Sequence, residues 1–204
     1  VKQTCAEGIF NGLIEDLGVN DIKGDYKKYK ANLHELKGNV LDIGAKIINK
    51  GNRTVHEPNC ANGTFFWQDY STSILIINGK VHQNNANHLP CPQSVFIVYK
   101  NGQVEMKRIK YATELNCNNI KLAVGGVGLR NTLDKNFKYS PTAEGFKGVY
   151  ADVLRNTNKT VIGYNKRLNK VYLLDKRNVS HGSLINLISD NSTGEAYDIA
   201  LSLD

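Results

Sequence analysis

Several ionisable side chains lie near the end of the chain, close to short apolar segments. Asp175, Arg177 and His181 follow the apolar residues 171–174 and precede a segment with helical spacing. The junction between a strand and a helix is a common place for a binding site. An arginine there can hold a phosphate with two parallel hydrogen bonds, and the first amides of the helix add donors. The alternative is an exposed turn with an Asp–Arg pair that contributes little to stability.

A second carboxylate, Asp204, follows the apolar segment 199–203. A carboxylate at the carboxyl end of a buried strand is a candidate for catalysis. A solvated terminus explains the same residue equally well.

Polar and aromatic residues also lie close together earlier in the sequence. His56 and Glu57 precede Asn-Gly-Thr-Phe-Phe-Trp at 62–67. The amide of Asn62 can donate to and accept from sugar hydroxyls, and aromatic rings can stack on a sugar face. Taken alone, however, this segment favours a turn followed by a core strand.

Several common site motifs are absent from the sequence. Gly-Gly-Val-Gly at 125–128 lacks the Lys-Ser/Thr of a phosphate loop, so we interpret it as a tight turn after a strand. No Gly-x-Ser-x-Gly elbow, His-x-x-x-His pair or EF-hand loop occurs. The four cysteines show no C-x-x-C spacing, which disfavours a zinc ribbon. We expect no cofactor, and metal dependence stays open.

The chain carries a net charge of +7, with a sequence pI of about 9.1. Such a balance fits an anionic partner, such as a phosphorylated glycan, and it also fits general solubility. No specific nucleic-acid site is predicted. The apolar runs are strand-sized, so no membrane span is expected. A secreted, cell-surface or virion-associated location is favoured over the cytoplasm, and the oligomeric state stays open.

The spacing of apolar residues predicts a fold of the α+β class, with a mixed, largely antiparallel sheet, hairpins and a few flanking helices. We expect a mainly helical N-terminal extension at 1–50, with helices at 5–17 and 25–37 and either a strand or a helix at 40–48. Asn-Gly turns predict hairpins at 73–81 and 95–109. Further strands are expected at 122–124, 160–164, 170–175 and 199–203, with a helix at 183–190.

Four stretches, taken in order, resemble the phosphodiester glycosidase family over roughly residues 45–204. They are Ala-Asn-Gly-Thr-Phe-Phe at 61–66, Ala-Val-Gly-Gly at 123–126, Lys-Thr-Val-Ile-Gly at 159–163 leading to Leu-Leu-Asp-Lys-Arg at 173–177, and His-Gly-Ser-Leu at 181–184 with the segment 199–204. Residues 51–204 are therefore expected to form a phosphodiester glycosidase-like domain.

This resemblance implies a hydrolase that cleaves a sugar-1-phosphate diester, such as one in a cell-wall or surface glycan. Cleavage at an anomeric carbon needs a proton donor for the leaving oxygen and a base or stabiliser opposite it. The catalytic candidates are Asp204 and Asp175, with His181 or Glu57 as an alternative acid or base. The substrate-binding candidates are Asn62, Gly63, Thr64, Gly126, Lys159, Thr160, Arg177 and Gly182. Lys159 and Arg177 are expected to hold the phosphate.

The chain departs from the family pattern at three places. Lys159 stands where the family has arginine, Lys176 replaces a glycine, and a glycine-rich loop is expected after Asp204, where this sequence ends. A lysine offers a point charge in place of a two-pronged contact. These departures leave open a non-catalytic module, of a phage tail or cell surface, that binds a carbohydrate or phosphate polymer. A nucleotide-binding protein is a further alternative.

Overall fold

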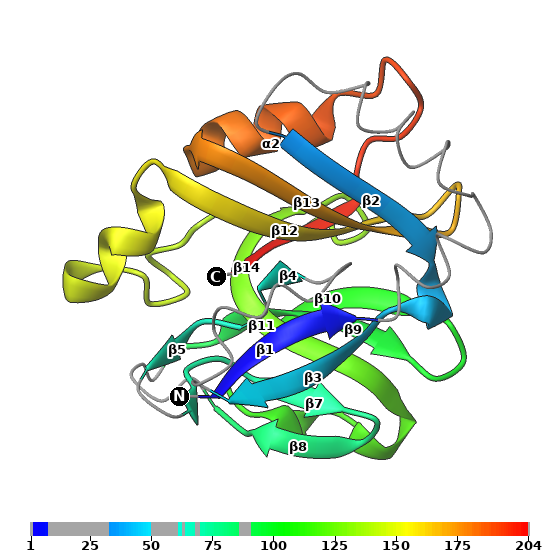
Figure 1. Ribbon diagram of the computed structural model, residues 1–204, viewed down its shortest axis with the longest axis vertical. Coiled ribbons are helices and arrows are strands. Elements are labelled where there is room, and N and C mark those ends of the chain that lie inside the picture. The colour runs from blue at the N-terminus through cyan, green and yellow to red at the C-terminus, as the bar shows by residue number, and fades with distance from the viewer. Residues whose placement is uncertain are drawn as a thin grey trace.

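The computed structural model describes residues 2–7, 33–49, 61–62, 64–67, 70–85 and 91–203 (Figure 1). Its main element is a nine-stranded sheet with the order β10-β9-β11-β14-β12-β13-β2, in which β7 and β8 branch from β11. Its strands are β2 (Leu33–Asn39), β7 (Leu75–Ile77), β8 (Lys80–Gln83), β9 (Gln93–Tyr99), β10 (Val104–Ile109), β11 (Ile120–Asn131), β12 (Thr157–Asn165), β13 (Lys170–Val179) and β14 (Ile199–Leu203). All the strand pairs described within it are antiparallel.

Smaller elements complete the described part of the chain. A three-stranded sheet joins β3 (Gly44–Asn49), β1 (Lys2–Glu7) and β4 (Ala61–Asn62), and β5 (Phe66–Trp67) pairs with β6 (Tyr70–Ser71). The 3₁₀ turns are η1 (Val40–Asp42), η3 (Ala112–Glu114), η4 (Cys117–Asn119) and η5 (Gly148–Leu154). The α-helix is α2 (His181–Ser189), which lies along β13 and β2 in Figure 1.

The predicted hairpins are confirmed. β7 pairs with β8 around Asn78 and Gly79, whose φ angles of 49° and 81° are those of a tight hairpin turn. β9 pairs with β10 around the second Asn-Gly turn, where Gly102 has a φ of 88°. The strand pair β12–β13, the helix α2 and the strand β14 also form where the sequence predicts them. Local turn chemistry and apolar alternation therefore suffice for these elements.

The predicted α+β class is wrong, because strands dominate the structure. Within the described ranges α2 is the only α-helix, and it accompanies one large antiparallel sheet. The difference lies in the N-terminal region. Residues 2–7 and 33–39 are strands, although helices were expected at 5–17 and 25–37; the remaining residues of those helices lie outside the described part. Residues 40–48 form η1 and most of β3.

Pairing across the sheet explains why helical spacing misled at these positions. β1 pairs with β3 over six residues, and β2 pairs with β13 over seven. Such long-range hydrogen bonds override a weak local periodicity. As a consequence, β2 belongs to the main sheet, whereas the division of the chain at residue 50 stays a prediction.

The predicted turn at 125–128 is also wrong, since these residues lie in the middle of β11. Their glycines allow close approach of neighbouring strands. A Cβ atom on Gly126 would lie 2.2 Å from the carbonyl oxygen of Ser202. Glycine is therefore required here by packing, without any turn or phosphate loop.

The main sheet carries apolar clusters on both of its faces. One face holds the interior cluster, which includes Ile162, Leu173 and Leu201. The other face holds the helix-side cluster, which includes Val161 and Leu174 from the sheet and Leu184 and Ile188 from α2; burying each such side chain stabilises the fold by about 1.5–3 kcal/mol. This packing fixes the start of α2 beside the ends of β12 and β13.

Candidate functional site

The start of α2 is defined by a side-chain cap. The helix begins at His181, two residues earlier than predicted, and Ser180 is its N-cap. The hydroxyl of Ser180 accepts a hydrogen bond from the backbone N–H of Ser183 at 3.1 Å. Such a cap contributes about 1 kcal/mol. The first amides of the helix carry a partial positive charge.

His181 is the most constrained of the predicted site residues. Its side chain is 3% exposed, and its Nδ1 lies 3.0 Å from the hydroxyl of Tyr139. The two rings meet edge to face, with centroids 5.9 Å apart. Among the described residues, Nε2 has no hydrogen-bond partner. A buried polar atom without a partner is costly, so this nitrogen is open to a ligand or a water molecule.

The environment of His181 keeps its imidazole neutral. Burial lowers its pKa to about 4, and the positive charge of Lys159 contributes to this shift. Burial also raises the pKa of Tyr139, as does the charge of Glu144. At neutral pH the site therefore contains an uncharged imidazole next to a protonated phenol.

Lys159 brings a buried positive charge to the same region. The residue is 5% exposed, and its Nζ donates to the carbonyl of Val153 at 2.7 Å and to the hydroxyl of Thr157 at 2.9 Å. Burial lowers its pKa, whereas the charge of Asp152 raises it. An ammonium group has three donors, and residues of the described part occupy two of them. Within that part of the chain the third donor has no partner.

Thr160 and Asp175 form a separate pair. The hydroxyl of Thr160 donates to Oδ1 of Asp175 at 2.7 Å across the β12–β13 ladder. Because side chains alternate along a strand, this pair shares the face of Ile162 and the interior cluster, whereas Lys159 shares the face of Val161 and α2. The two groups lie at the same end of the sheet but on opposite faces.

The remaining described candidates lie on several elements. Thr64 is buried and precedes Phe65, whose ring lies 5.9 Å from that of Phe146 in the helix-side cluster. Arg177 and Gly182 are exposed, at the end of β13 and in the first turn of α2. Gly126 is buried in β11, and the backbone of Asn62 lies in β4.

Three predicted site residues, Asp204, Glu57 and Gly63, lie outside the described residues, as does His56. Their roles, like those of the described candidates, stay predictions. Tyr139 is not predictable from the sequence, because it lies in a polar loop 42 residues from His181 and belongs to no motif. Only the folded structure brings the two rings together.

No metal centre is visible in the described ranges, since no three His, Cys, Asp or Glu side chains there are grouped to hold an ion. No helix in the described part is both long and apolar enough to cross a membrane.

The fold is similar to that of a known class of enzyme domain, the phosphodiester glycosidases. A solved structure with this fold is the catalytic domain of zebrafish N-acetylglucosamine-1-phosphodiester α-N-acetylglucosaminidase, auto-inhibited by its pro-peptide. The two are 17% identical with a TM-score of 0.53; the match covers 70% of this chain and 49% of the zebrafish chain. This chain thus spans about half the length of that structure. At this identity the similarity is a distant relationship of fold. No protein-family model and no curated protein sequence matches the chain.

Proposed function

We propose that this chain is a hydrolase of the phosphodiester glycosidase family, which cleaves a sugar-1-phosphate diester into a free sugar and a phosphate monoester. Three findings support the proposal: the shared fold, the order of the four sequence motifs, and the polar cluster at the start of α2. A hydrolase-like fold alone does not define an activity. The cluster therefore carries the proposal.

The observation that matters most is the pair of buried polar side chains at the start of α2, Lys159 and His181. A buried ammonium group with a free donor attracts a phosphate more strongly than a solvated one, since little water screens it. The first amides of α2 add hydrogen-bond donors and a favourable dipole. Together they suit the phosphate of the substrate.

In this proposal, His181 donates a hydrogen bond and does not act as a general acid. With a pKa of about 4, it is not protonated at neutral pH. The phenol of Tyr139 donates to Nδ1, which leaves the proton of the imidazole on Nε2, facing the phosphate. This tautomer is part of the proposal. The acid and base at the anomeric carbon are then carboxylates, for which Asp175, Asp204 and Glu57 are the candidates.

The test is a product analysis. The protein is incubated with UDP-N-acetylglucosamine and with an N-acetylglucosamine-1-phosphate methyl diester, and the products are separated by mass. When the reaction is run in ¹⁸O-labelled water, free N-acetylglucosamine that carries the label, together with unlabelled UDP or methyl phosphate, supports the proposal. N-acetylglucosamine-1-phosphate as the product would instead indicate cleavage at phosphorus, and would refute a glycosidase.

A second candidate function is a non-catalytic module that binds an anionic glycan. One observation favours it: Asp175 lies on the face of the sheet opposite Lys159 and His181. A phosphate held at the start of α2 is then separated from Asp175 by the sheet, and the described carboxylates whose charges reach Lys159 and Tyr139 are Asp152 and Glu144. Saturable binding of the methyl diester without release of sugar would support this module in place of the enzyme.

A further inference from the structure

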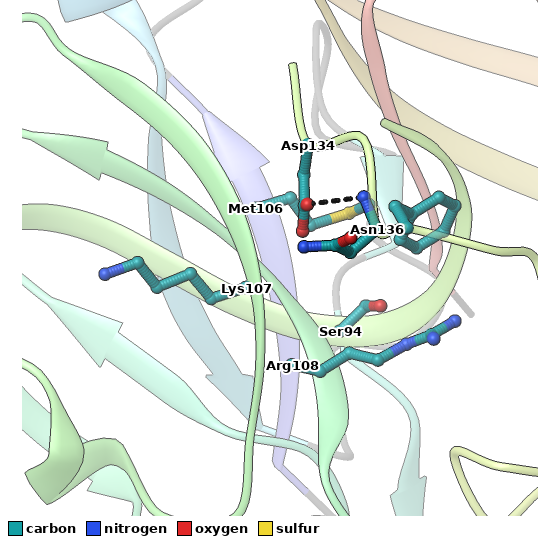
Figure 2. Close-up of a pocket in the computed structure, with 7 residues that line it drawn as sticks. Ser94, Met106, Lys107, Arg108, Asp134 and Asn136 are labelled. Carbon is teal, nitrogen blue, oxygen red and sulfur yellow. Dashed lines mark hydrogen bonds between the residues drawn. The ribbon is translucent and has the colours of Figure 1, made fainter. Parts of the chain in front are cut away.

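A second polar site lies between the strands β9 and β10 and the turn that follows β11. A cavity of about 80 Å³ opens there (Figure 2). It shares no lining residue with the candidate site at the start of α2. Its walls are formed by Ser94, Met106, Lys107, Arg108, Asp134, Asn136 and Phe137.

A fully buried carboxylate organises one wall of this cavity. Glu144 accepts a hydrogen bond from the backbone N–H of Ser94 at 2.5 Å through Oε1, and its Oε2 lies 3.0 Å from the guanidinium of Arg108. The guanidinium also lies over the ring of Phe137, at 4.7 Å from its centroid. Ser94 and Arg108 are therefore held in place without any ligand. Such preorganisation is typical of binding sites.

One polar atom on this wall lacks a partner. The Nε of Arg108 is buried and makes no hydrogen bond within the described ranges. The completely buried hydroxyl of Ser94 lies beside the carboxylate of Glu144, whose pKa its hydrogen bond lowers, so its oxygen can still accept a hydrogen bond from a ligand. Leaving a buried donor unpaired costs about 1–3 kcal/mol. A water molecule needs only about 10–15 Å³, so the cavity has room for several waters or for a small polar group of a ligand.

The opposite wall presents acceptors. Figure 2 shows Asp134 and Asn136 across the cavity from Ser94 and Arg108, whereas the side chain of Lys107 extends away from them. Oδ1 of Asp134 accepts a hydrogen bond from the backbone N–H of Asn136 at 2.9 Å, which fixes the carboxylate.

The balance of charge selects the kind of ligand. The charge of Arg108 is compensated by Glu144, and Nζ of Lys107 lies 3.4 Å from Glu105. An anion in the cavity would thus face the carboxylate of Asp134, and the two cations among the described lining residues are already paired with carboxylates. A hydroxyl group suits both walls, because it donates to a carboxylate and accepts from a guanidinium.

We propose that this cavity binds the adjacent hydroxyl groups of a sugar or polyol. One hydroxyl donates to Asp134, and its neighbour accepts from Nε of Arg108 and contacts the hydroxyl of Ser94. Met106 and Phe137 supply apolar surface for the carbon atoms between them. The inference does not depend on the proposed hydrolysis, since it concerns binding at another place in the fold.

The experiment is a titration of ¹⁵N-labelled protein followed by NMR. Glycerol, methyl α-D-glucopyranoside and N-acetylglucosamine are added separately, and the amides of Ser94, Gly128 and Asn136 are observed. At least one probe should shift these amides in a saturable way. The variant Ser94→Ala loses one hydrogen bond, so its dissociation constant should rise about three- to tenfold. Ser73→Ala, which removes a buried hydroxyl outside the cavity, should leave the constant unchanged.

A charge variant separates a sugar site from an anion site. Asp134→Asn keeps an oxygen for the turn but removes the negative charge, and Asp134 is exposed, so folding should be preserved. It should weaken sugar binding and strengthen the binding of inorganic phosphate. The proposal fails if none of the three probes shifts these amides, if Ser94→Ala binds as the wild type does, or if phosphate binds the wild type more tightly than every sugar probe. These results are independent of sugar release, so hydrolysis and this binding site can succeed or fail separately.

Discussion

Protonation of His181 should destabilise the folded protein, by an amount that follows from its burial. An imidazole in an unfolded chain has a pKa of about 6.5, whereas burial and the charge of Lys159 lower the pKa of His181 to about 4. Between these values the unfolded state binds the extra proton more readily than the folded state. The stability that the neutral imidazole of His181 gives the folded state is therefore fully present above pH 6.5, and it is lost as the pH falls toward 4. The difference of about 2.5 pKa units corresponds to roughly 3 kcal/mol.

The assay is urea unfolding at pH 4, 5, 6 and 7, for the wild type and for His181→Asn, which does not titrate in this range. The free energy of unfolding of the wild type, relative to that of the variant, should fall by about 3 kcal/mol from pH 7 to pH 4. His82→Asn, on the exposed side of β8, controls for the loss of an imidazole. A difference between the wild type and His181→Asn that stays constant over this range, or an NMR titration of His181 with a midpoint near 6.5, would refute the reasoning.

Three further predictions concern the same end of the sheet and the strand β11. Lys159→Met should reduce sugar release at least tenfold by removing the buried ammonium, whereas Lys166→Met, in an exposed turn, should not; rates of release from the methyl diester check this. Tyr139→Phe removes the hydrogen bond to Nδ1 of the imidazole, so the free energy of unfolding, measured with urea or heat, should fall by about 1 kcal/mol. The ¹⁵N chemical shifts of the imidazole should also report a change in tautomer. Gly128→Ala should destabilise the protein by about 1–3 kcal/mol, because the added Cβ would lie 2.3 Å from the hydroxyl of Ser94. As a control, the Cβ of Gly182→Ala would lie no closer than 3.8 Å to a neighbouring atom, so this variant should be as stable as the wild type. Equal unfolding midpoints for the two alanine variants would contradict the packing described for β11.

The parts of the fold that the sequence predicts well depend on neighbours in the chain. Asn78-Gly79 closes a hairpin because both residues readily adopt positive φ, and the alternation of Val95 and Ile97 marks a buried strand. α2 is predictable for the same reason, since its apolar residues recur at helical spacing.

The parts that the sequence does not predict depend on distant partners. β2 is a strand because β13 pairs with it, more than 130 residues later. The glycines at 125–128 serve the approach of β14 and of Ser94, and such contacts leave no local signal. The candidate site shows both cases: the motifs indicate Lys159 and His181, but only the fold adds Tyr139 and separates Asp175 from them by the thickness of the sheet.

The central claim is that the cluster at the start of α2 serves the cleavage of a sugar-1-phosphate diester. The most direct test is product analysis with the N-acetylglucosamine-1-phosphate methyl diester, comparing the wild type with Lys159→Met. Free N-acetylglucosamine and methyl phosphate are expected from the wild type, with release at least tenfold slower for Lys159→Met. A diester that the wild type leaves intact, or that both proteins cleave at the same rate, would contradict the claim.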